Sequence, residues 1–169
     1  MLDVKIRGSR TKIEARLLHK AKLAGVECPH VLEVLPYSIA MTKEDGEMLH
    51  EKIKKNKKIA NSAWKLAGIF LARLHFAKII HGDYTPANLM LDGKGRLTVI
   101  DFGLGGISND SEDYAVDVLT MKKALSDAKA RKAFLAGYGS EEMKLGGKKP
   151  VLHLVDEMEK RGRYRERGE

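Results

Sequence analysis

One stretch constrains this chain more than any other: residues 79–106, which read IIHGDYTPANLMLDGKGRLTVIDFGLGG. It places Asn88 five residues after Asp83, and Asp101 eighteen residues after Asp83. Two apolar segments, NLML and RLTVID, flank a Gly-Lys-Gly turn and predict a β-hairpin between Asn88 and Asp101. Such a hairpin would return Asp101 to the loop that carries Asp83 and Asn88. We therefore expect these three polar side chains to converge.

The oxygen atoms of this set suit Mg²⁺, which takes oxygen ligands and retains some water, better than Zn²⁺. Magnesium held in this way normally bridges the phosphate oxygens of a nucleotide. We expect Asp101 to bind the bridging Mg²⁺, Asn88 to bind a second metal ion, and Asp83 to accept the proton of an attacking hydroxyl or water. Gly103 would allow the backbone to turn after Asp101. The competing interpretation is structural: Asp83 and Asn88 cap a loop, and Asp101 ends a strand.

Three further polar side chains are expected to have structural roles. Asp117 should lie near the start of a helix, where it could cap the backbone of the loop or simply favour the helix N-terminus. His81 is expected to orient the loop by hydrogen bonding rather than by proton transfer. His75 lies on a nearly all-apolar helical pattern, so we interpret it as a buried structural histidine.

The whole chain predicts an α+β protein in two unequal lobes. Apolar periodicity and end signals predict helices over residues 9–25, 46–56, 61–78, 115–125, 129–136 and 151–160, and strands over residues 30–35 and 37–42 besides the hairpin. Ser9 is the expected N-cap of the first helix. A hinge over residues 42–46 would divide a first domain, residues 1–44, from a mostly helical second domain, residues 45–169.

The composition fits a soluble globular protein, with 43% hydrophobic and 32% charged residues in 169. No apolar run approaches the ~20 residues that a membrane span needs. Cys28 is the single cysteine, so an internal disulfide is impossible, which suits the reducing cytoplasm.

Positive charge is concentrated in parts of the chain. The formal net charge is +8, and basic residues cluster over residues 5–22, in KIKKNKK at residues 52–58, and in the closing KRGRYRERGE. This tail carries Arg161, Arg163, Arg165 and Arg167. Such clusters favour RNA or another polyanion as a partner. The alternative is a solvated helix face followed by a solubilising tail.

The motifs carry a resemblance to a known family. His-x-Asp-x-x-x-x-Asn followed by Asp-Phe-Gly is the protein-kinase signature set. Together with RTKIEARLL, AGVECPHV, EDYAVDVL and RGRYR, it resembles the small atypical, RIO-like serine/threonine kinase/ATPase subunit of the KEOPS complex, over nearly the whole chain. The resemblance implies a minimal bilobal kinase-like fold, with an incomplete N-lobe of one helix and two strands and a small helical C-lobe.

The resemblance also implies a function. Members of this family use ATP and Mg²⁺, hydrolyse ATP and phosphorylate serine or threonine, and support the enzyme that makes threonylcarbamoyladenosine (t6A) in tRNA. They bind that synthase subunit and a small regulatory subunit in the cytoplasm. Their basic C-terminal tail takes part in tRNA handling, which would give Arg161, Arg163, Arg165 and Arg167 a role. Glu14 would be the glutamate that pairs with the ATP-holding lysine, or else an ordinary helix residue.

Departures from the family pattern leave other functions open. The chain begins just past the region where the family carries a glycine-rich loop and the ATP-holding lysine, so we expect an N-terminal truncation, weak ATP binding and low turnover. His-Gly-Asp replaces His-Arg-Asp, which removes the arginine that reads an activation-loop phosphate. One alternative is a pseudokinase scaffold between tRNA and the modification enzyme. Another is a small-molecule phosphotransferase of the aminoglycoside or choline kinase type.

Overall fold

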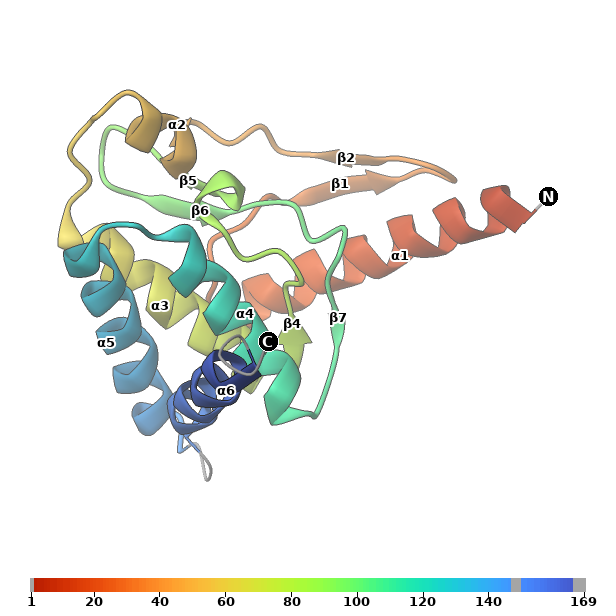
Figure 1. Cartoon of the computed structure of the whole chain (residues 1–169). Coiled ribbons are helices and arrows are strands. Elements are labelled where there is room, and N and C mark those ends of the chain that lie inside the picture. Colours follow the sequence, from red (N-terminus) through yellow and green to blue (C-terminus); the bar gives the residue numbers. More distant parts are fainter. Residues whose placement is uncertain (1, 147–149, 166–169) are drawn as a thin grey trace.

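A computed structural model describes residues 2–146 and 150–165, with side chains described over residues 10–146 and 150–161 (Figure 1). The helices are α1 (Leu2–Leu23), α2 (Leu49–Lys54), α3 (Asn61–Phe76), the 3-10 helix η1 (Pro86–Asn88), α4 (Ser111–Ala124), α5 (Ala128–Lys144) and α6 (Val151–Arg165). The strands are β1 (Val31–Val34), β2 (Ile39–Met41), β3 (Glu47–Met48), β4 (Ile79–Ile80), β5 (Leu89–Leu91), β6 (Leu97–Val99) and β7 (Gly106–Ile107). The predicted α+β class is confirmed.

The N-terminal part consists of α1 and an antiparallel pair of strands, β1 and β2. The C-terminal half of α1 buries Leu17, Leu18 and Ala21 in the core, while its N-terminal half extends beyond the rest of the molecule (Figure 1). The prediction that Ser9 caps this helix is wrong, because α1 already begins at Leu2. No proline interrupts residues 2–9, and each residue added to an existing helix gains a hydrogen bond, so the helix continues past the expected cap.

The predicted hairpin is present and belongs to a three-stranded antiparallel sheet in the order β3-β5-β6. Leu89 pairs with Val99 and Leu91 with Leu97. Asp92 closes the turn, since its Oδ1 accepts hydrogen bonds from the backbone N–H groups of Lys94 and Arg96 at 2.9 and 2.8 Å. The first residues of the predicted helix over 46–56 instead form β3, which pairs with β5 before α2 begins.

Helices α3 and α5 pack through two glycines, one on each helix. A Cβ atom on Gly68 would lie 2.0 Å from the Phe134 carbonyl oxygen, and one on Gly137 would lie 2.0 Å from the Lys65 carbonyl oxygen. These distances leave no room for any side chain, so the glycines set the close approach of the two backbones. The approach holds α3, which ends just before the site-bearing loop, against the helical body.

Substituting either of these glycines should destabilise the protein strongly. For Gly68→Ala or Gly137→Ala we predict that the free energy of unfolding falls by about 3 kcal/mol, because the helices must separate to admit the methyl group. Urea denaturation of each variant measures this, and Gly93→Ala, where a Cβ would meet nothing within 4 Å, is the matched control. A loss for Gly68→Ala or Gly137→Ala no larger than that of Gly93→Ala would contradict the described packing.

The lysine cluster at residues 52–58 is partly neutralised within the fold. Glu47 Oε1 lies 2.6 Å from the Lys55 Nζ, and its Oε2 lies 2.7 Å from the Lys57 Nζ. Hydrogen bonds from these two lysines lower the pKa of Glu47 to about 2. For this cluster, local ion pairing therefore accounts for part of the charge.

None of the described helices is long and apolar enough to cross a bilayer.

Candidate active site

The loop between β4 and β5 brings two of the predicted site residues into contact. The Asn88 side-chain nitrogen Nδ2 donates to both the backbone oxygen and the Oδ2 of Asp83, each at 2.9 Å. Since the amide nitrogen is used in this way, Asn88 Oδ1 remains as an acceptor. Asn88 is buried, so the amide has a fixed position from which it orients the Asp83 carboxylate.

The third residue, Asp101, follows the far strand of the hairpin. The Ile100 N–H donates to the Asn88 carbonyl at 3.0 Å, which ties the end of β6 to the loop. Asp101 is exposed and adopts a φ of 59°, a strained conformation for a residue other than glycine. Its Oδ1 accepts from the Gly103 N–H at 3.1 Å. The hairpin thus returns Asp101 toward the Asp83 loop, as the sequence predicts.

Glu14 reaches this segment from α1. A Cβ on Gly103 would lie 3.1 Å from Asp101 Oδ1 and 4.0 Å from Glu14 Oε2, so both carboxylates lie around this glycine. Burial and then the negative charge of Asp101 raise the pKa of Glu14. Among the described side chains, none forms an ion pair with Glu14, so the expected pairing with a lysine stays a prediction.

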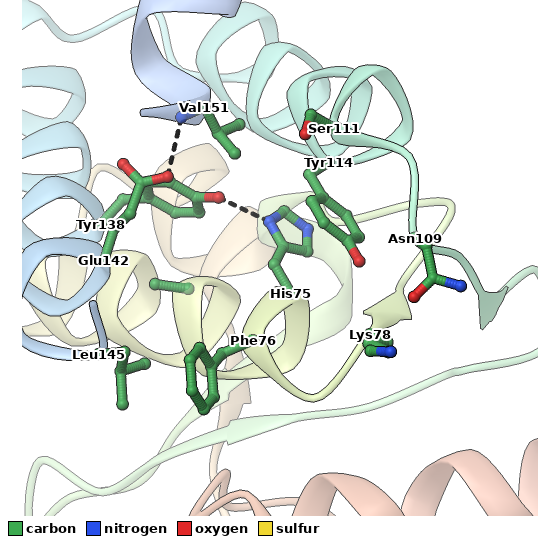
Figure 2. Close-up of a pocket in the computed structure, with 11 residues that line it drawn as sticks. His75, Phe76, Lys78, Asn109, Ser111, Tyr114, Tyr138, Glu142, Leu145 and Val151 are labelled. Atoms are coloured by element: carbon green, nitrogen blue, oxygen red, sulfur yellow. Dashed lines mark hydrogen bonds between the residues drawn. The ribbon is translucent and has the colours of Figure 1, made fainter. Parts of the chain in front are cut away.

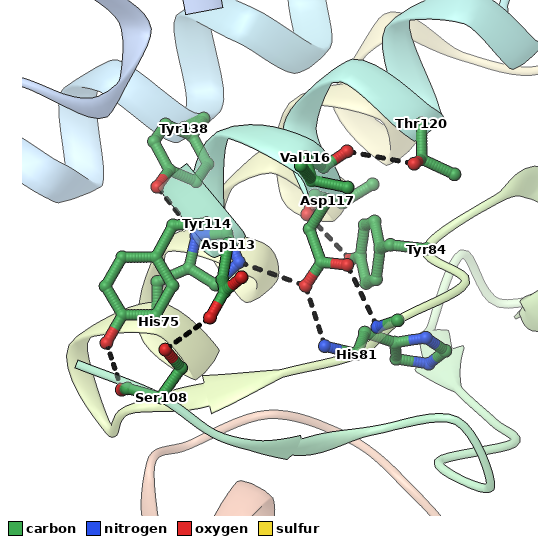
Figure 3. Close-up of polar contacts among 12 residues, drawn as sticks. His75, His81, Tyr84, Ser108, Asp113, Tyr114, Val116, Asp117, Thr120 and Tyr138 are labelled. Atoms are coloured by element: carbon green, nitrogen blue, oxygen red, sulfur yellow. Dashed lines mark hydrogen bonds and ion pairs between the residues drawn. The ribbon is translucent and has the colours of Figure 1, made fainter. Parts of the chain in front are cut away.

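Asp117 caps the backbone of the loop, as one of the two interpretations of its position predicts. Its Oδ2 accepts from the His81 N–H at 2.7 Å and its Oδ1 from the Gly82 N–H at 2.9 Å (Figure 3). Asp117 is buried within α4, past the helix N-terminus, so the alternative of a simple helix-terminal acid is wrong. Two backbone N–H groups on one buried carboxylate hold the loop that carries Asp83.

Steric crowding and the backbone conformation explain why residue 82 is a glycine. Its φ is 80°, and a Cβ there would lie 2.3 Å from the Leu104 carbonyl oxygen. The loop around Asp83 and the segment after Asp101 therefore approach so closely that an arginine, as in His-Arg-Asp, would not fit in this backbone arrangement.

Both histidines behave as the sequence predicts, by holding structure through hydrogen bonds. His81 Nε2 donates to the Ile100 carbonyl at 3.1 Å, since a carbonyl can only accept. His75 Nε2 lies 3.3 Å from Asp117 Oδ2 and its Nδ1 lies 2.7 Å from the Tyr138 hydroxyl. A carboxylate also only accepts, so neutral His75 donates from Nε2 to Asp117 and accepts from Tyr138 at Nδ1.

These histidines should make the stability depend on pH. Burial lowers the pKa of both His75 and His81 below 6.5, with Asp117 acting in the opposite sense. The unfolded chain therefore binds protons before the native state does, and the free energy of unfolding falls as the pH drops. We predict a measurable loss between pH 7.5 and 6, at most about 1.4 kcal/mol per pH unit for each histidine. Urea denaturation across this interval tests it, and constant or rising stability toward pH 6 would contradict it. Glu14 and Glu142, whose pKa values burial raises from 4.5, act in the opposite sense as the pH drops.

Two tyrosines that sequence reasoning missed complete the support. Tyr84, directly after Asp83, is fully buried and donates its hydroxyl to the Ala67 carbonyl on α3 at 2.8 Å. Its position next to Asp83 could have drawn attention to it. Tyr138 lies 63 residues from His75, and no local signal marks it.

The predicted tRNA-handling residues are only partly described. Arg161 is exposed on α6 with its guanidinium 3.8 Å from Glu157 Oε2. Arg163 and Arg165 continue α6, but their side chains lie outside the described residues, as does Arg167 entirely. Their role stays a prediction.

A magnesium ion fits the oxygen donors of the site. Asn88 Oδ1 is a free hard oxygen, and the Asp101 carboxylate is exposed beside the same loop. With Asp101 on the bridging Mg²⁺ and Asn88 on a second ion, each ion would keep positions for phosphate and water oxygens, which is the way Mg²⁺ is usually bound. No group of three or more His, Cys, Asp or Glu side chains gathers into a metal site within the described part of the chain.

Comparison with known proteins relates this geometry to a family. The phosphotransferase enzyme family matches residues 76–147. A relative from Archaeoglobus fulgidus, "Probable serine/threonine-protein kinase BUD32 homolog", is 37% identical over 98% of this chain and 82% of its own length. The "EKC/KEOPS complex subunit BUD32" of Encephalitozoon cuniculi is also 37% identical, over 98% of this chain and 81% of its own. The chain belongs to the BUD32 family.

Other relatives are longer than this BUD32-family chain. The "Probable bifunctional tRNA threonylcarbamoyladenosine biosynthesis protein" of Methanobrevibacter smithii is 42% identical over 96% of this chain, which spans 30% of that protein. Among solved structures, the bifunctional kinase-methyltransferase WbdD matches 89% of this chain and 40% of its own, with a TM-score of 0.52 and 17% identity. That likeness concerns the fold alone, and it supports the predicted minimal kinase-like architecture.

Proposed function

We propose that this BUD32-family chain is an atypical serine/threonine kinase/ATPase subunit that supports t6A modification of tRNA. The observation that carries the proposal is the fixed loop: Asp117 holds the backbone at His81 and Gly82, and Asn88 holds the Asp83 carboxylate. The t6A context comes from relatives whose names include the KEOPS complex and tRNA threonylcarbamoyladenosine biosynthesis.

In the proposed mechanism, the chain positions and stabilises charge rather than forming a covalent intermediate. Asp83 accepts the proton of the attacking hydroxyl or water. Asn88 keeps the Asp83 carboxylate oriented through the 2.9 Å hydrogen bond. The Asp101 carboxylate would hold the bridging Mg²⁺ and Asn88 Oδ1 a second metal ion, and this positive charge would neutralise charge on the phosphates of ATP. Gly103 donates its N–H to Asp101 and keeps this carboxylate in place.

The two proposed domains have different proposed roles. Residues 1–44 form the partial N-lobe, from which α1 presents Glu14 to the site. Residues 45–169 form the C-lobe with the loop and the basic tail. The proposed partners are the t6A synthase subunit, a small regulatory subunit and tRNA, which Arg161, Arg163, Arg165 and Arg167 would contact.

ATP hydrolysis and phosphate transfer to protein, measured with and without the t6A synthase partner and tRNA, test this function. The expected result is Mg²⁺-dependent ATP consumption that rises with the partner and is lost in Asp101→Asn. Asp156→Asn, an exposed acid on α6, is the matched control and should retain activity. Absence of Mg²⁺-dependent activity and of nucleotide binding in the complex would leave the scaffold function instead. Transfer to a small alcohol rather than to protein or water would indicate the other phosphotransferase class.

A further inference from the structure

A concavity lies in the helical body, away from the Asp83 loop. It has a volume of about 560 Å³, within the range of pockets that bind small molecules (Figure 2). Its walls come from the ends of α3, α4, α5 and α6 and are mainly apolar: Ala72, Phe76, Tyr114, Tyr138, Leu145 and Val151. Phe76 is 61% exposed at its edge, so apolar surface is open to solvent there.

The polar groups of this pocket are unevenly placed. Lys78 lies at the turn after α3, and Asn109 and Ser111 lie around the start of α4; all three can donate hydrogen bonds (Figure 2). No carboxylate of the described residues forms an ion pair with Lys78. On the opposite side, Glu142 accepts a hydrogen bond from the Val151 N–H at 2.8 Å. An anionic group would therefore be attracted to the Lys78 side and repelled from the Glu142 side.

We propose that this pocket is a binding site for a small amphiphilic carboxylate, with its apolar body against Phe76, Tyr138 and Leu145 and its carboxylate at Lys78. The apolar walls supply most of the binding free energy, by removing the apolar surface of the ligand from water. Lys78 selects the charge of the head group through a charge-assisted hydrogen bond.

The pocket is connected to the Asp83 loop by an unbroken series of hydrogen bonds. Tyr138, in the pocket wall, donates to His75 at 2.7 Å, and His75 donates to Asp117 at 3.3 Å. Asp117 accepts from the backbone of His81 and Gly82 at 2.7 and 2.9 Å. The ring of Tyr114 stacks on His75 at 4.6 Å and also lines the pocket. A ligand there contacts the first members of the series that holds the catalytic loop.

Occupancy should strengthen this series. His75 and Tyr138 are already buried, so a bound apolar body would act by packing against the rings of Tyr114 and Tyr138 and restricting their motion. The backbone N–H groups of His81 and Gly82 should then open less often. The site would thereby stabilise the ordered form of the loop that carries Asp83.

Binding can be tested by calorimetry with three probes that share one chain and differ in the head group: decanoate, decanol and decylammonium. We expect decanoate to bind tightest and decylammonium weakest. Lys78→Met should weaken the binding of decanoate by about tenfold and change the binding of decanol by no more than about twofold, as expected for the loss of one charge-assisted hydrogen bond. Lys58→Met, an exposed lysine outside the pocket, is the matched control and should change neither.

Two pocket-filling variants locate the site. Ala72→Leu and Leu145→Trp, checked for native circular dichroism, should each reduce decanoate and decanol binding together. Tightest binding of decylammonium, no binding of any probe, or binding that both filling variants and Lys78→Met leave unchanged would overturn the proposal. If one filling variant fails to fold, the other and Lys78→Met still decide.

Amide hydrogen exchange tests the connection to the loop. Neither this measurement nor the calorimetry requires catalytic turnover. Decanoate should slow exchange at His81 and Gly82 at least threefold more than at amides of the β5–β6 hairpin. Tyr138→Phe keeps the ring but removes the hydroxyl that donates to His75. This variant should still bind decanoate within about threefold yet lose the selective slowing. Equal effects at the loop and the hairpin, or slowing that persists in Tyr138→Phe, would refute the connection.

Discussion

Replacing Asp83 with asparagine should lower the rate of ATP consumption by about a thousandfold. Asparagine has nearly the same shape, but its amide cannot take the proton from an attacking hydroxyl or water. The Asn88 contact at 2.9 Å fixes the orientation of the Asp83 carboxylate, so no other described acid is placed to replace it in that loop. Phosphate release in the presence of the t6A synthase partner measures the rate.

The expected loss concerns catalysis and not nucleotide binding. Asp83→Asn should retain Mg²⁺-dependent binding of an ATP analogue within about threefold, because Asp83 is not one of the proposed metal ligands. Asp156→Asn again serves as the matched control. A rate for Asp83→Asn within tenfold of the unmodified chain would show that Asp83 is not the base.

Replacing Asp117 with alanine should lower the free energy of unfolding by about 4 kcal/mol. The substitution removes a buried carboxylate that accepts from the His81 N–H, the Gly82 N–H and His75 Nε2. Two buried donors, the His81 N–H and His75 Nε2, then lose their partner together with the part-buried Gly82 N–H. Urea denaturation monitored by circular dichroism gives the change.

A conservative variant separates the hydrogen bonds from the packing in this experiment. Asp117→Asn keeps the volume and one acceptor oxygen. It should therefore lower the free energy of unfolding by about 1 to 2 kcal/mol less than Asp117→Ala does. Asp156→Ala on the exposed face of α6 should be nearly neutral. If Asp117→Ala were as mild as Asp156→Ala, the carboxylate would not be what holds the loop.

Much of the site could be predicted from sequence because its parts are local. The spacing of Asp83, Asn88 and Asp101, with a turn signal between the last two, defines a hairpin whose ends must meet. The structural role of His75 followed from the apolar context of its helix, in which a buried polar side chain needs a partner. Loop capping by Asp117 was one of two interpretations of its expected place near a helix start, and only the structure decides between them.

The parts that could not be predicted depend on contacts between distant segments. Nothing near Tyr138 indicates that its hydroxyl donates to His75, because the contact exists only once α3 and α5 pack. The same packing explains why Gly68 and Gly137 are glycines, because a Cβ on either would collide with the facing helix. Local signals also failed at Ser9, where a favourable capping residue lies inside a helix that starts earlier.

The domain boundary and the roles of the tail residues stay predictions. The segment between β2 and β3, residues 42–46, is where the proposed N-lobe would join the C-lobe. Limited proteolysis at this segment and at the tail would indicate whether the lobes separate there.

The most direct test of the central claim is a crystal structure of the chain with Mg²⁺ and a non-hydrolysable ATP analogue. We predict that an Asp101 carboxylate oxygen lies about 2.1 Å from the Mg²⁺ that contacts the phosphate oxygens, and that Asn88 Oδ1 lies about 2.1 Å from a second metal ion. We further predict that the Asp83 carboxylate faces the terminal phosphate. A nucleotide bound elsewhere, or a metal ion held without Asn88 and Asp101, would contradict these predictions.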